Sequence, residues 1–223
     1  MPLGLGMQRT YDGGQRLSKG VLGYSWRHNF DLSATVVSNA EQGLGRDSAI
    51  DAASIIAGSY AISKVLAVVR DRDRLMIASI AQSWLVDQLK KNTVDVNTGG
   101  SSQLFVKLAD GSYNPPPGSA DVLTGGTGFT LKQKCGITLS FNSTGQITQW
   151  QAPGGASTDN KVTFTYDSAN ANRLQTVTST YGRTLSFGYD ASGAAGRINS
   201  VSDGTGRSVS YGYDGFCKVV GDA

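Results

Sequence analysis

The C-terminal part of the chain alternates large side chains with small polar ones. Residues 183–189 and 207–213 share this pattern, with large residues at Arg183, Leu185, Phe187 and Tyr189 and at Arg207, Val209, Tyr211 and Tyr213. A period of two is typical of a β-strand that packs one face and presents the other to water. Val162, Phe164 and Tyr166 follow the same frame, and Leu139 with Phe141 forms a weaker copy. The pattern predicts a run of strands between residues 136 and 223.

These strands belong to a sequence repeat. Tyr-Asp pairs occur three times, separated by 23 and 24 residues: Tyr166-Asp167, Tyr189-Asp190 and Tyr213-Asp214. Three further features return after 24 residues: Gly182-Arg183 as Gly206-Arg207, Arg173-Leu174 as Arg197-Ile198, and Val177 as Val201. Features that keep one period indicate a repeated structural unit. We therefore predict that each unit is a β-hairpin and that successive hairpins pair into one antiparallel sheet.

The glycines and aspartates of the repeat fit the turns of such hairpins. Gly182 and Gly206 stand just before a strand, where a tight turn needs a residue that tolerates positive φ. Asp167, Asp190 and Asp214 end strands, where a carboxylate can accept a hydrogen bond from the following backbone in an Asx turn. We prefer turn chemistry over catalysis as the interpretation of these aspartates.

Residues 47–92 follow a different pattern, with almost no glycine or proline. Their apolar positions on the two sides of the charged run 70–74 are Ile55, Tyr60, Ile62, Val65, Leu66 and Val69, then Leu75, Ile77, Ile80, Trp84, Leu85 and Leu89. This spacing predicts two helices broken near the charged run. Asp47 or Ser48 is the expected N-cap, and Lys90-Lys91 fits a C-terminal turn. We expect the helices to form a hairpin that packs against the sheet.

Together these patterns predict a mainly β chain with a helical insertion, in which an antiparallel β-hairpin repeat ribbon is joined to a helical hairpin. The expected segments are N-terminal strands at 1–46, the helical hairpin at 47–92, an extended connection with strands at 93–135 and hairpin repeats at 136–223. Gln103–Leu108 is the expected strand of the connection. The prolines of residues 111–118 favour a rigid loop laid over the sheet over a ligand for a proline-reading partner.

Composition and charge exclude several classes of protein. The chain has 223 residues, of which 29 are glycine and 39% are hydrophobic. Glycine without a three-residue period excludes collagen, and the apolar content argues against a disordered chain. A dispersed net charge of +3 is too weak for a nucleic-acid interface. The most apolar window, 49–69, contains Asp51 and Lys64 and predicts a buried helix rather than a membrane span, and no signal peptide is expected at the N-terminus.

Few residues are available for catalysis or metal binding. The chain has one histidine, and His28, Cys135 and Cys217 lack the short ligand spacing of a zinc site. The two cysteines are either a disulfide pair or, as we prefer, separate thiols. No nucleophile elbow or phosphate loop occurs, so no catalytic, cofactor-binding or metal-binding residue is predicted. His28 could act as a general base beside Asp31, but we prefer a structural histidine that ties its strand to a neighbour by hydrogen bonds.

The aromatic residues of the repeat form two rows along the sequence, one of Phe164, Phe187 and Tyr211 and one of Tyr166, Tyr189 and Tyr213. At equal heights on adjacent hairpins they would form ladders across the sheet. Buried ladders stabilise a sheet through cross-strand pairs, whereas exposed ladders stack on sugar rings. We prefer packing, and Tyr189, Tyr211 and Tyr213 are the candidates for stacking on a glycan.

The repeat and the N-terminal sequence resemble the bacterial Rhs, or YD-repeat, proteins, which are related in architecture to the cocoon subunits of insecticidal toxins and to teneurins. The resemblance rests on the Tyr-Asp and Gly-Arg pairs and on residues 22–31, which look like the motif that precedes the repeats in such proteins. The motif residues are Trp26, Arg27, His28, Asn29 and Asp31. The resemblance covers most of the chain, from Arg9 to Val220.

The resemblance implies a β-ribbon that spirals into a hollow shell, often around a C-terminal toxin, in a secreted or cell-surface bacterial protein. The chain has three clear repeats where a closed shell uses many, and it lacks the self-cleaving C-terminal core motif and a toxin domain, so we expect no toxic activity. We expect a non-catalytic segment that starts and caps the ribbon. The alternative is a carbohydrate-binding module, and a hydrolase or toxin is the least favoured.

The expected partners follow from this interpretation. They are further YD-repeat segments, another repeat-bearing chain, or a second copy joined through an unpaired edge at the last hairpin, 207–213. A glycan is the alternative ligand. Nucleic acid and a membrane span are not expected.

Overall fold

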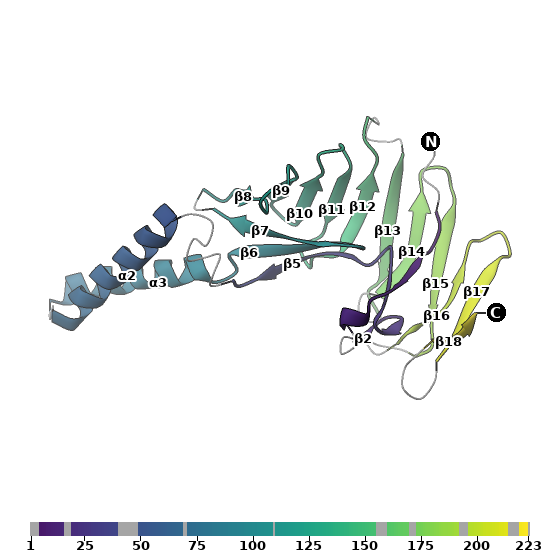
Figure 1. The fold of residues 1–223 in the computed structure, drawn as a ribbon, viewed down its shortest axis with the longest axis horizontal. Coiled ribbons are helices and arrows are strands. Elements are labelled where there is room, and N and C mark those ends of the chain that lie inside the picture. The colour runs from purple at the N-terminus through teal and green to yellow at the C-terminus, as the bar shows by residue number, and fades with distance from the viewer. Residues whose placement is uncertain are drawn as a thin grey trace.

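The computed structural model describes residues 5–15, 19–39, 49–68, 71–108, 110–154, 160–169, 173–191, 196–213 and 219–222. Within them the chain is mainly β, with antiparallel sheets and two long helices. Figure 1 shows a long sheet, a smaller sheet beside its first strands, and a helical hairpin at one end of the molecule. The predicted fold class, mainly β with a helical insertion, is confirmed at this level.

The large sheet contains ten strands among the described residues, each antiparallel to the next in chain order. They are β9 (Val122–Gly125), β10 (Phe129–Lys132), β11 (Thr138–Phe141), β12 (Ile147–Gln151), β13 (Lys161–Asp167), β14 (Arg173–Ser179), β15 (Thr184–Tyr189), β16 (Ile198–Ser202), β17 (Ser208–Tyr213) and β18 (Val219–Asp222). The strands predicted from alternation are present. Because the sheet begins at Val122, the predicted boundary between 135 and 136 lies inside it.

The last predicted hairpin does not form the edge of the sheet, contrary to our expectation for residues 207–213. On its outer side β17 pairs with β18, with Tyr211 opposite Asp222 and Tyr213 opposite Val219. Residues 219–222 read Val-Val-Gly-Asp and do not alternate. The period-two pattern therefore could not detect this strand.

The small sheet consists of β5 (Leu32–Val37), β6 (Thr93–Thr98), β7 (Ser102–Lys107) and β8 (Tyr113–Asn114) within the described part of the chain. β5 and β6 pair along their whole length, so the helices are inserted between two paired strands. β7 matches the strand predicted at 103–108. Tyr113 of β8 packs edge-to-face on Phe129 of β10, with ring centroids 6.0 Å apart. The segment 111–118, predicted as a loop over the sheet, therefore contacts the large sheet at Tyr113.

The helical insertion consists of α2 (Ala49–Val68) and α3 (Arg72–Leu89). The carboxylate of Asp71 caps α3, because its Oδ1 accepts hydrogen bonds from the backbone N–H of Asp73 (3.0 Å) and Arg74 (3.2 Å). The helices are therefore broken at the charged run, as predicted. The expected N-caps of the first helix, Asp47 and Ser48, lie outside the described residues.

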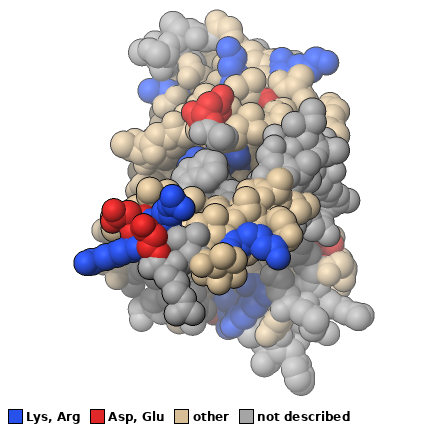
Figure 2. All heavy atoms as spheres, turned by 90° about the vertical axis from the view of Figure 1, so that its left-hand side faces the viewer, with Lys and Arg blue, Asp and Glu red and all other residues tan. Residues whose placement is uncertain are grey.

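The helical hairpin does not pack against a sheet, so this expectation is wrong. Figure 1 shows it projecting beyond the small sheet, and large apolar side chains on both helices are more than half exposed, including Ile56, Tyr60, Ile77 and Ile80. The apolar residues of α2 are spread around the helix, so no single stripe is available to dock on a sheet. In Figure 2, which views this end, basic and acidic side chains lie next to each other. Neither described helix has the length and apolar character needed to cross a membrane.

The N-terminal segment, residues 5–31, crosses one face of the large sheet. It contains β1 (Arg9–Tyr11), η1 (Gly13–Gln15), β2 (Lys19–Gly20), β3 (Gly23–Tyr24) and β4 (Trp26–His28), with β1 paired to β4 and β2 to β3. In Figure 1 this segment lies over β13 to β16. The backbone N–H of Ile198 on β16 donates to the carbonyl of Val21 at 2.9 Å, which joins the segment to the sheet.

The two sheets meet at Gly145, in the turn between β11 and β12. The backbone N–H of Ala34 on β5 donates to the carbonyl of Gly145 at 2.8 Å. Gly145 has φ of 81°, and a Cβ added there would lie 2.1 Å from the carbonyl oxygen of Ala34. Both the backbone conformation and the close approach therefore require glycine.

We predict that Gly145→Ala lowers the free energy of unfolding by about 3–4 kcal/mol, because strain at positive φ adds to a clash with a backbone that cannot move freely. Gly182→Ala is the matched control. It has φ of 77° and open space around the added Cβ, so its cost is limited to about 1–2 kcal/mol of backbone strain. Urea denaturation measures both, and equal losses would contradict the role of the sheet junction.

Candidate functional site

The candidate functional site is the face of the large sheet that the N-terminal segment covers. Phe164, Phe187 and Tyr211 point to this face and are at least nine-tenths buried. Residues between them in the alternating strands, such as Ser186 and Ser210, are exposed. The first aromatic row is therefore part of the core.

The aromatic residues do not lie at equal heights on the sheet, and this part of the prediction is wrong. Phe164 lies opposite Val177, which lies opposite Leu185. Phe187 starts the next row, opposite Val201 and then Val209. Equivalent residues of successive units are thus displaced by two residues along the strands, so the rows that start at Phe164 and Phe187 continue in aliphatic side chains on the next two strands.

A β-bulge recurs at the corresponding place in each unit. Between β13 and β14 the register shifts so that Gln175 is extra, and between β15 and β16 Asn199 is extra. Thr148 has the same position between β11 and β12. Such bulges bend a strand and increase its twist. The bend is therefore repeated along the sheet.

The tyrosines of the repeat contact the preceding unit. We define the units as the hairpins β13–β14, β15–β16 and β17–β18. The hydroxyl of Tyr189 donates to the carbonyl of Leu174 at 2.8 Å, and the guanidinium of Arg173 lies 4.2 Å from its ring centroid. This combination of a hydrogen bond and a cation–π contact, which we call the tyrosine clamp, joins β15 to the unit before it.

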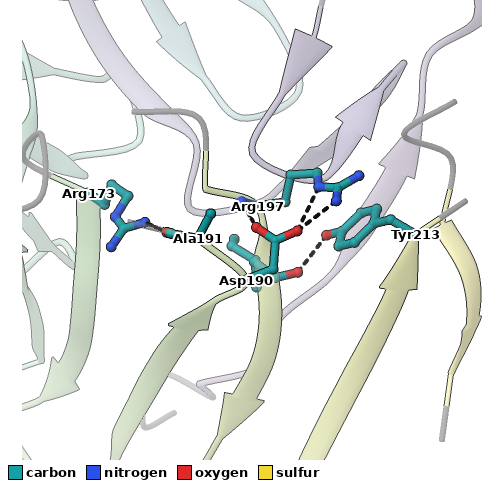
Figure 3. A network of polar contacts seen from close by, with 6 residues as sticks. Arg173, Asp190, Ala191, Arg197 and Tyr213 are labelled. Atoms are coloured by element: carbon teal, nitrogen blue, oxygen red, sulfur yellow. Dashed lines mark hydrogen bonds and ion pairs between the residues drawn. The ribbon is translucent and has the colours of Figure 1, made fainter. Parts of the chain in front are cut away.

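The same clamp recurs one unit later. The hydroxyl of Tyr213 donates to the carbonyl of Ile198, and the guanidinium of Arg197 lies 4.2 Å from the ring centroid. Figure 3 shows Tyr213 and Arg197 side by side at the end of the hairpin. The clamp explains why Tyr-Asp and Arg-Leu or Arg-Ile keep a common period. The sequence contained this signal, because each tyrosine follows its arginine by the same spacing.

The aspartate next to the tyrosine positions the arginine of its own unit. Asp190 Oδ2 accepts from Arg197 Nε at 2.8 Å and pairs with Nη2 at 2.7 Å, while Oδ1 accepts from the Arg197 backbone N–H at 2.7 Å (Figure 3). Partial burial opposes ionisation of Asp190, but the hydrogen bonds and charge of Arg197 outweigh it and hold the pKa of the carboxyl below its ordinary value. Asp190 thus spans its loop instead of forming the predicted Asx turn.

The other aspartates of the repeat differ in part. Asp167 accepts from the backbone N–H of Ala169 at 3.0 Å, as expected for an Asx turn. Asp214 lies outside the described residues. Asp203, which the repeat signature did not include, accepts from Thr205 and pairs with Arg207 at 2.6 Å in the next tight turn.

The Gly-Arg pairs form the tight turns that connect the units. Gly182 and Gly206 have φ of 77° and 94°, as predicted. The carbonyl of Arg183 accepts from the backbone N–H of Ser179, and that of Arg207 accepts from Asp203. The backbone carbonyls of these arginines therefore close the turns, and Arg207 also stabilises its turn through the ion pair with Asp203.

The N-terminal motif packs on the buried aromatic row. Phe30 contacts Phe164 and Phe187 edge-to-face, with ring centroids 6.1 and 6.2 Å away. Asn29 fixes the motif against the preceding strand, since its Oδ1 accepts from the Gln8 backbone N–H at 2.8 Å and its Nδ2 donates to the Gly6 carbonyl at 3.0 Å. The motif therefore covers the sheet with an aromatic side chain held by local hydrogen bonds.

Two other residues of the motif, Trp26 and Arg27, lie half-buried on β4. Trp26 packs against Tyr11 with ring centroids 5.4 Å apart, and the Arg9 guanidinium lies 5.4 Å from the Trp26 ring. The same guanidinium lies 4.9 Å from the ring of Tyr211. Arg9 therefore links the N-terminal segment to β17.

Tyr166, the first tyrosine of the repeat, lies near Asp31 of the N-terminal motif. Burial and, after it, the nearby Asp31 carboxylate raise the pKa of Tyr166. The residue that precedes Tyr166 by the clamp spacing is Trp150, not an arginine. Tyr166 is therefore placed against the motif where later tyrosines meet an arginine.

His28 is buried between the motif and the sheet. Its ring lies 6.2 Å from that of Phe187, and its Nδ1 has no hydrogen-bond partner among the described residues. Burial lowers the pKa of His28, and the Asp31 carboxylate opposes this effect. The backbone of His28 pairs with that of Arg9 on β1, and this pairing ties the two strands.

The candidates for glycan stacking are engaged by other side chains. Tyr211 is buried under Arg9, and one ring face of Tyr189 and of Tyr213 carries a guanidinium. Glycan binding stays a prediction. Of the residues considered for zinc, Cys135 is exposed and Cys217 lies outside the described residues, and no three metal-binding side chains cluster in the described part of the chain.

A hollow of about 240 Å³ lies beside Phe30, where the segment leaves the sheet. Its apolar lining includes Leu5, Leu139, Trp150 and Phe164. The amide of Asn29, which also lines it, is already hydrogen-bonded within the segment. Thr98 and Gln133 line it as well, so the hollow has both apolar and polar walls.

We predict that Arg173 and Tyr189 are energetically coupled. In a double-mutant cycle with Arg173→Met and Tyr189→Leu, the coupling energy should be about 1 kcal/mol, because a partly desolvated cation–π contact is lost only once. Arg173→Met with Tyr213→Leu is the matched control, since these residues belong to different clamps, and it should be additive. Urea denaturation of the variants gives both values, and equal coupling in the two cycles would refute the clamp.

We further predict a loss of stability at alkaline pH. Burial raises the pKa of Tyr189 and Tyr213 to about 12. Because the fold favours the neutral phenol, its contribution is complete below the ordinary value of about 10 and is lost as the pH rises towards 12. Replacing both residues with phenylalanine should reduce the slope of this dependence, to which Tyr166 with its raised pKa also contributes, and urea denaturation across the range measures the slope. An unchanged slope in the variant would contradict the prediction.

Comparison of the chain with models of known protein families gives no match. A search of the curated proteins also gives none. The features of the chain that bear on function are therefore the clamps, the two-residue displacement between successive units, which we call the stagger, and the N-terminal segment.

Proposed function

We propose that the chain is a non-catalytic structural segment of a bacterial Rhs/YD-repeat shell, which starts a β-ribbon and caps its covered face in a toxin-delivery or cell-surface system. The tyrosine clamp carries this proposal. Tyr189 and Tyr213 make the same two contacts to the unit before them. The residues that define the repeat thus serve to join one unit to the next.

The clamp supports an extendable array. The middle unit, β15–β16, receives Tyr213 of the following unit through Arg197 and the Ile198 carbonyl, and it offers its own Tyr189 to the preceding unit. Asp190 holds Arg197 within one unit, and Arg197 then lies over Tyr213 of the next. Units that contact only their neighbours form a one-dimensional array. Further repeat-bearing segments are therefore the partners that such a clamp would bind.

The stagger, which is the displacement by two residues between equivalent strands of successive units, supports a ribbon that coils. Phe164 and Phe187 are equivalent in sequence but lie two residues apart along the strands. A sheet that closes on itself needs a register displacement of its strands. The bulges at Gln175 and Asn199 add twist at equivalent places. A wall built in this way bends in one direction as units are added.

The N-terminal segment supports the role of a cap. Phe30 covers Phe164 and Phe187, and the segment's Val21 carbonyl binds the sheet at Ile198. The first tyrosine, Tyr166, meets Asp31 of this segment. The segment thus gives Tyr166 a neighbour where later tyrosines meet an arginine, and it shields the apolar face of the strands over which it lies.

The proposal predicts that an added unit stabilises the end of the sheet. A chain extended after Ala223 by a copy of residues 203–222, which is one tight turn with its β17–β18 hairpin, should protect the backbone amides of β17 and β18 at least about tenfold better against hydrogen exchange, because opening this end then also costs the added contacts.

The matched control carries the same extension with its copy of Tyr213 replaced by leucine, and it should give a smaller gain because it lacks the clamp. If the extension stays unfolded, or if both extensions protect β17 equally, the array interpretation is overturned.

A further inference from the structure

His28 is the single histidine of the chain and lies at the contact between the N-terminal segment and the large sheet. It is 4% exposed, and the aromatic ring of Phe187 faces it. Its Nδ1 lacks a partner among the described residues. A buried polar atom without a partner is costly, and an imidazolium in that place would carry a charge and an Nδ1–H with no acceptor among the described residues.

The charged and titratable groups around His28 offer little compensation. On its own segment the Asp31 carboxylate favours protonation, but desolvation is the larger effect. From β1, Arg9 pairs with His28 through the backbone, while its guanidinium lies over Trp26 and Tyr211. From the sheet, the phenols of Tyr166 and Tyr189 remain neutral in acid. Solvation by water is thus the main stabilisation available to a protonated His28.

We propose that protonation of His28 loosens the N-terminal segment from the covered face of the large sheet, so that mild acid opens this face while the hairpins of the sheet stay paired. Opening brings the imidazolium into water and removes Phe30 from Phe164 and Phe187. The proposal rests on the docked geometry and does not depend on the assignment to a shell.

The turns of the sheet resist the same acid. Hydrogen bonds from Thr205, and then from Arg207, hold the pKa of Asp203 at about 2. Arg197 likewise holds the pKa of Asp190 below its ordinary value. These carboxylates stay ionised where a histidine with an ordinary value of 6.5 becomes protonated. Mild acid therefore acts on the segment before it acts on the turns.

Hydrogen exchange on the full chain tests the proposal through two backbone amides. The N–H of Ile198 donates across the contact to Val21, whereas that of Ser179 donates within the sheet to Arg183, across the tight turn between β14 and β15. After correction for intrinsic exchange, the opening constant at Ile198 should rise by up to about tenfold per pH unit below 6.5, because one proton is taken up on opening. The opening constant at Ser179 should stay constant over this range. The same dependence at both amides means global unfolding and overturns the proposal.

Two variants identify the group that takes up the proton. His28→Gln keeps a neutral polar side chain and should abolish the pH dependence at Ile198, whereas Asp31→Asn, the matched control, should retain it. The opposite result assigns the proton to Asp31 and refutes the proposal.

NMR titration of the single imidazole in the unmodified chain tests the proposal independently of how the variants fold. A midpoint below 6.5 that accompanies the opening supports the proposal, and a midpoint at or above 6.5 contradicts it.

Discussion

The contact of Tyr189 and of Tyr213 with the arginine of the preceding unit is the interaction on which the rest of the structure depends. A two-stranded hairpin is at best marginally stable alone, so each unit must gain its stability from its neighbours. Tyr189 does this at the strand end, where Arg173 covers its ring and the Leu174 carbonyl accepts its hydroxyl hydrogen. The neighbouring aspartate completes the arrangement. Asp190 fixes Arg197 across the loop, so that Arg197 is already in place for Tyr213. The Tyr-Asp pair therefore serves two neighbours. Its tyrosine contacts the preceding unit, and its aspartate holds the arginine that contacts the following unit.

The parts of the fold that the sequence predicted are those that a local pattern reports. Period two marks a strand with one packed face, which is why β13, β15 and β17 were found, and positive φ in a tight turn selects glycine, which located Gly182 and Gly206. The stagger was missed because it depends on one extra residue, Gln175 or Asn199, whose side chain carries no special pattern. The clamp was also missed, although Arg173 precedes Tyr189 by the spacing at which Arg197 precedes Tyr213. The contact of Phe30 with Phe187 joins residues too distant in the chain for any periodicity to indicate it.

Coverage of the apolar face explains the position of the N-terminal segment. A sheet with one apolar face must bury that face against another layer. In this chain the helices do not serve that purpose, because they project away from the sheets with apolar side chains exposed. The N-terminal segment serves instead, with short strands that leave much of the binding to side chains such as Phe30 and to the Ile198–Val21 hydrogen bond. A cover held by a few contacts is weaker than the ladder beneath it, so the two layers can respond separately to the same change in conditions.

The two edges of the large sheet differ in a way that gives the assembly a direction. At the first edge, β9 is short, and β8 of the small sheet lies beside it with the Tyr113 ring packed over Gly125. The segment between β8 and β9 contains Pro115, Pro116 and Pro117, which have no N–H to donate to a ladder. Covering an edge and placing proline near it are ordinary means of preventing further pairing. The clamp points in the same direction along the chain, because Arg173 and Arg197 each contact a tyrosine of the unit that follows. A blocked first edge and a forward-facing clamp together favour growth from the later hairpins only, which is the geometry that a segment starting a ribbon requires.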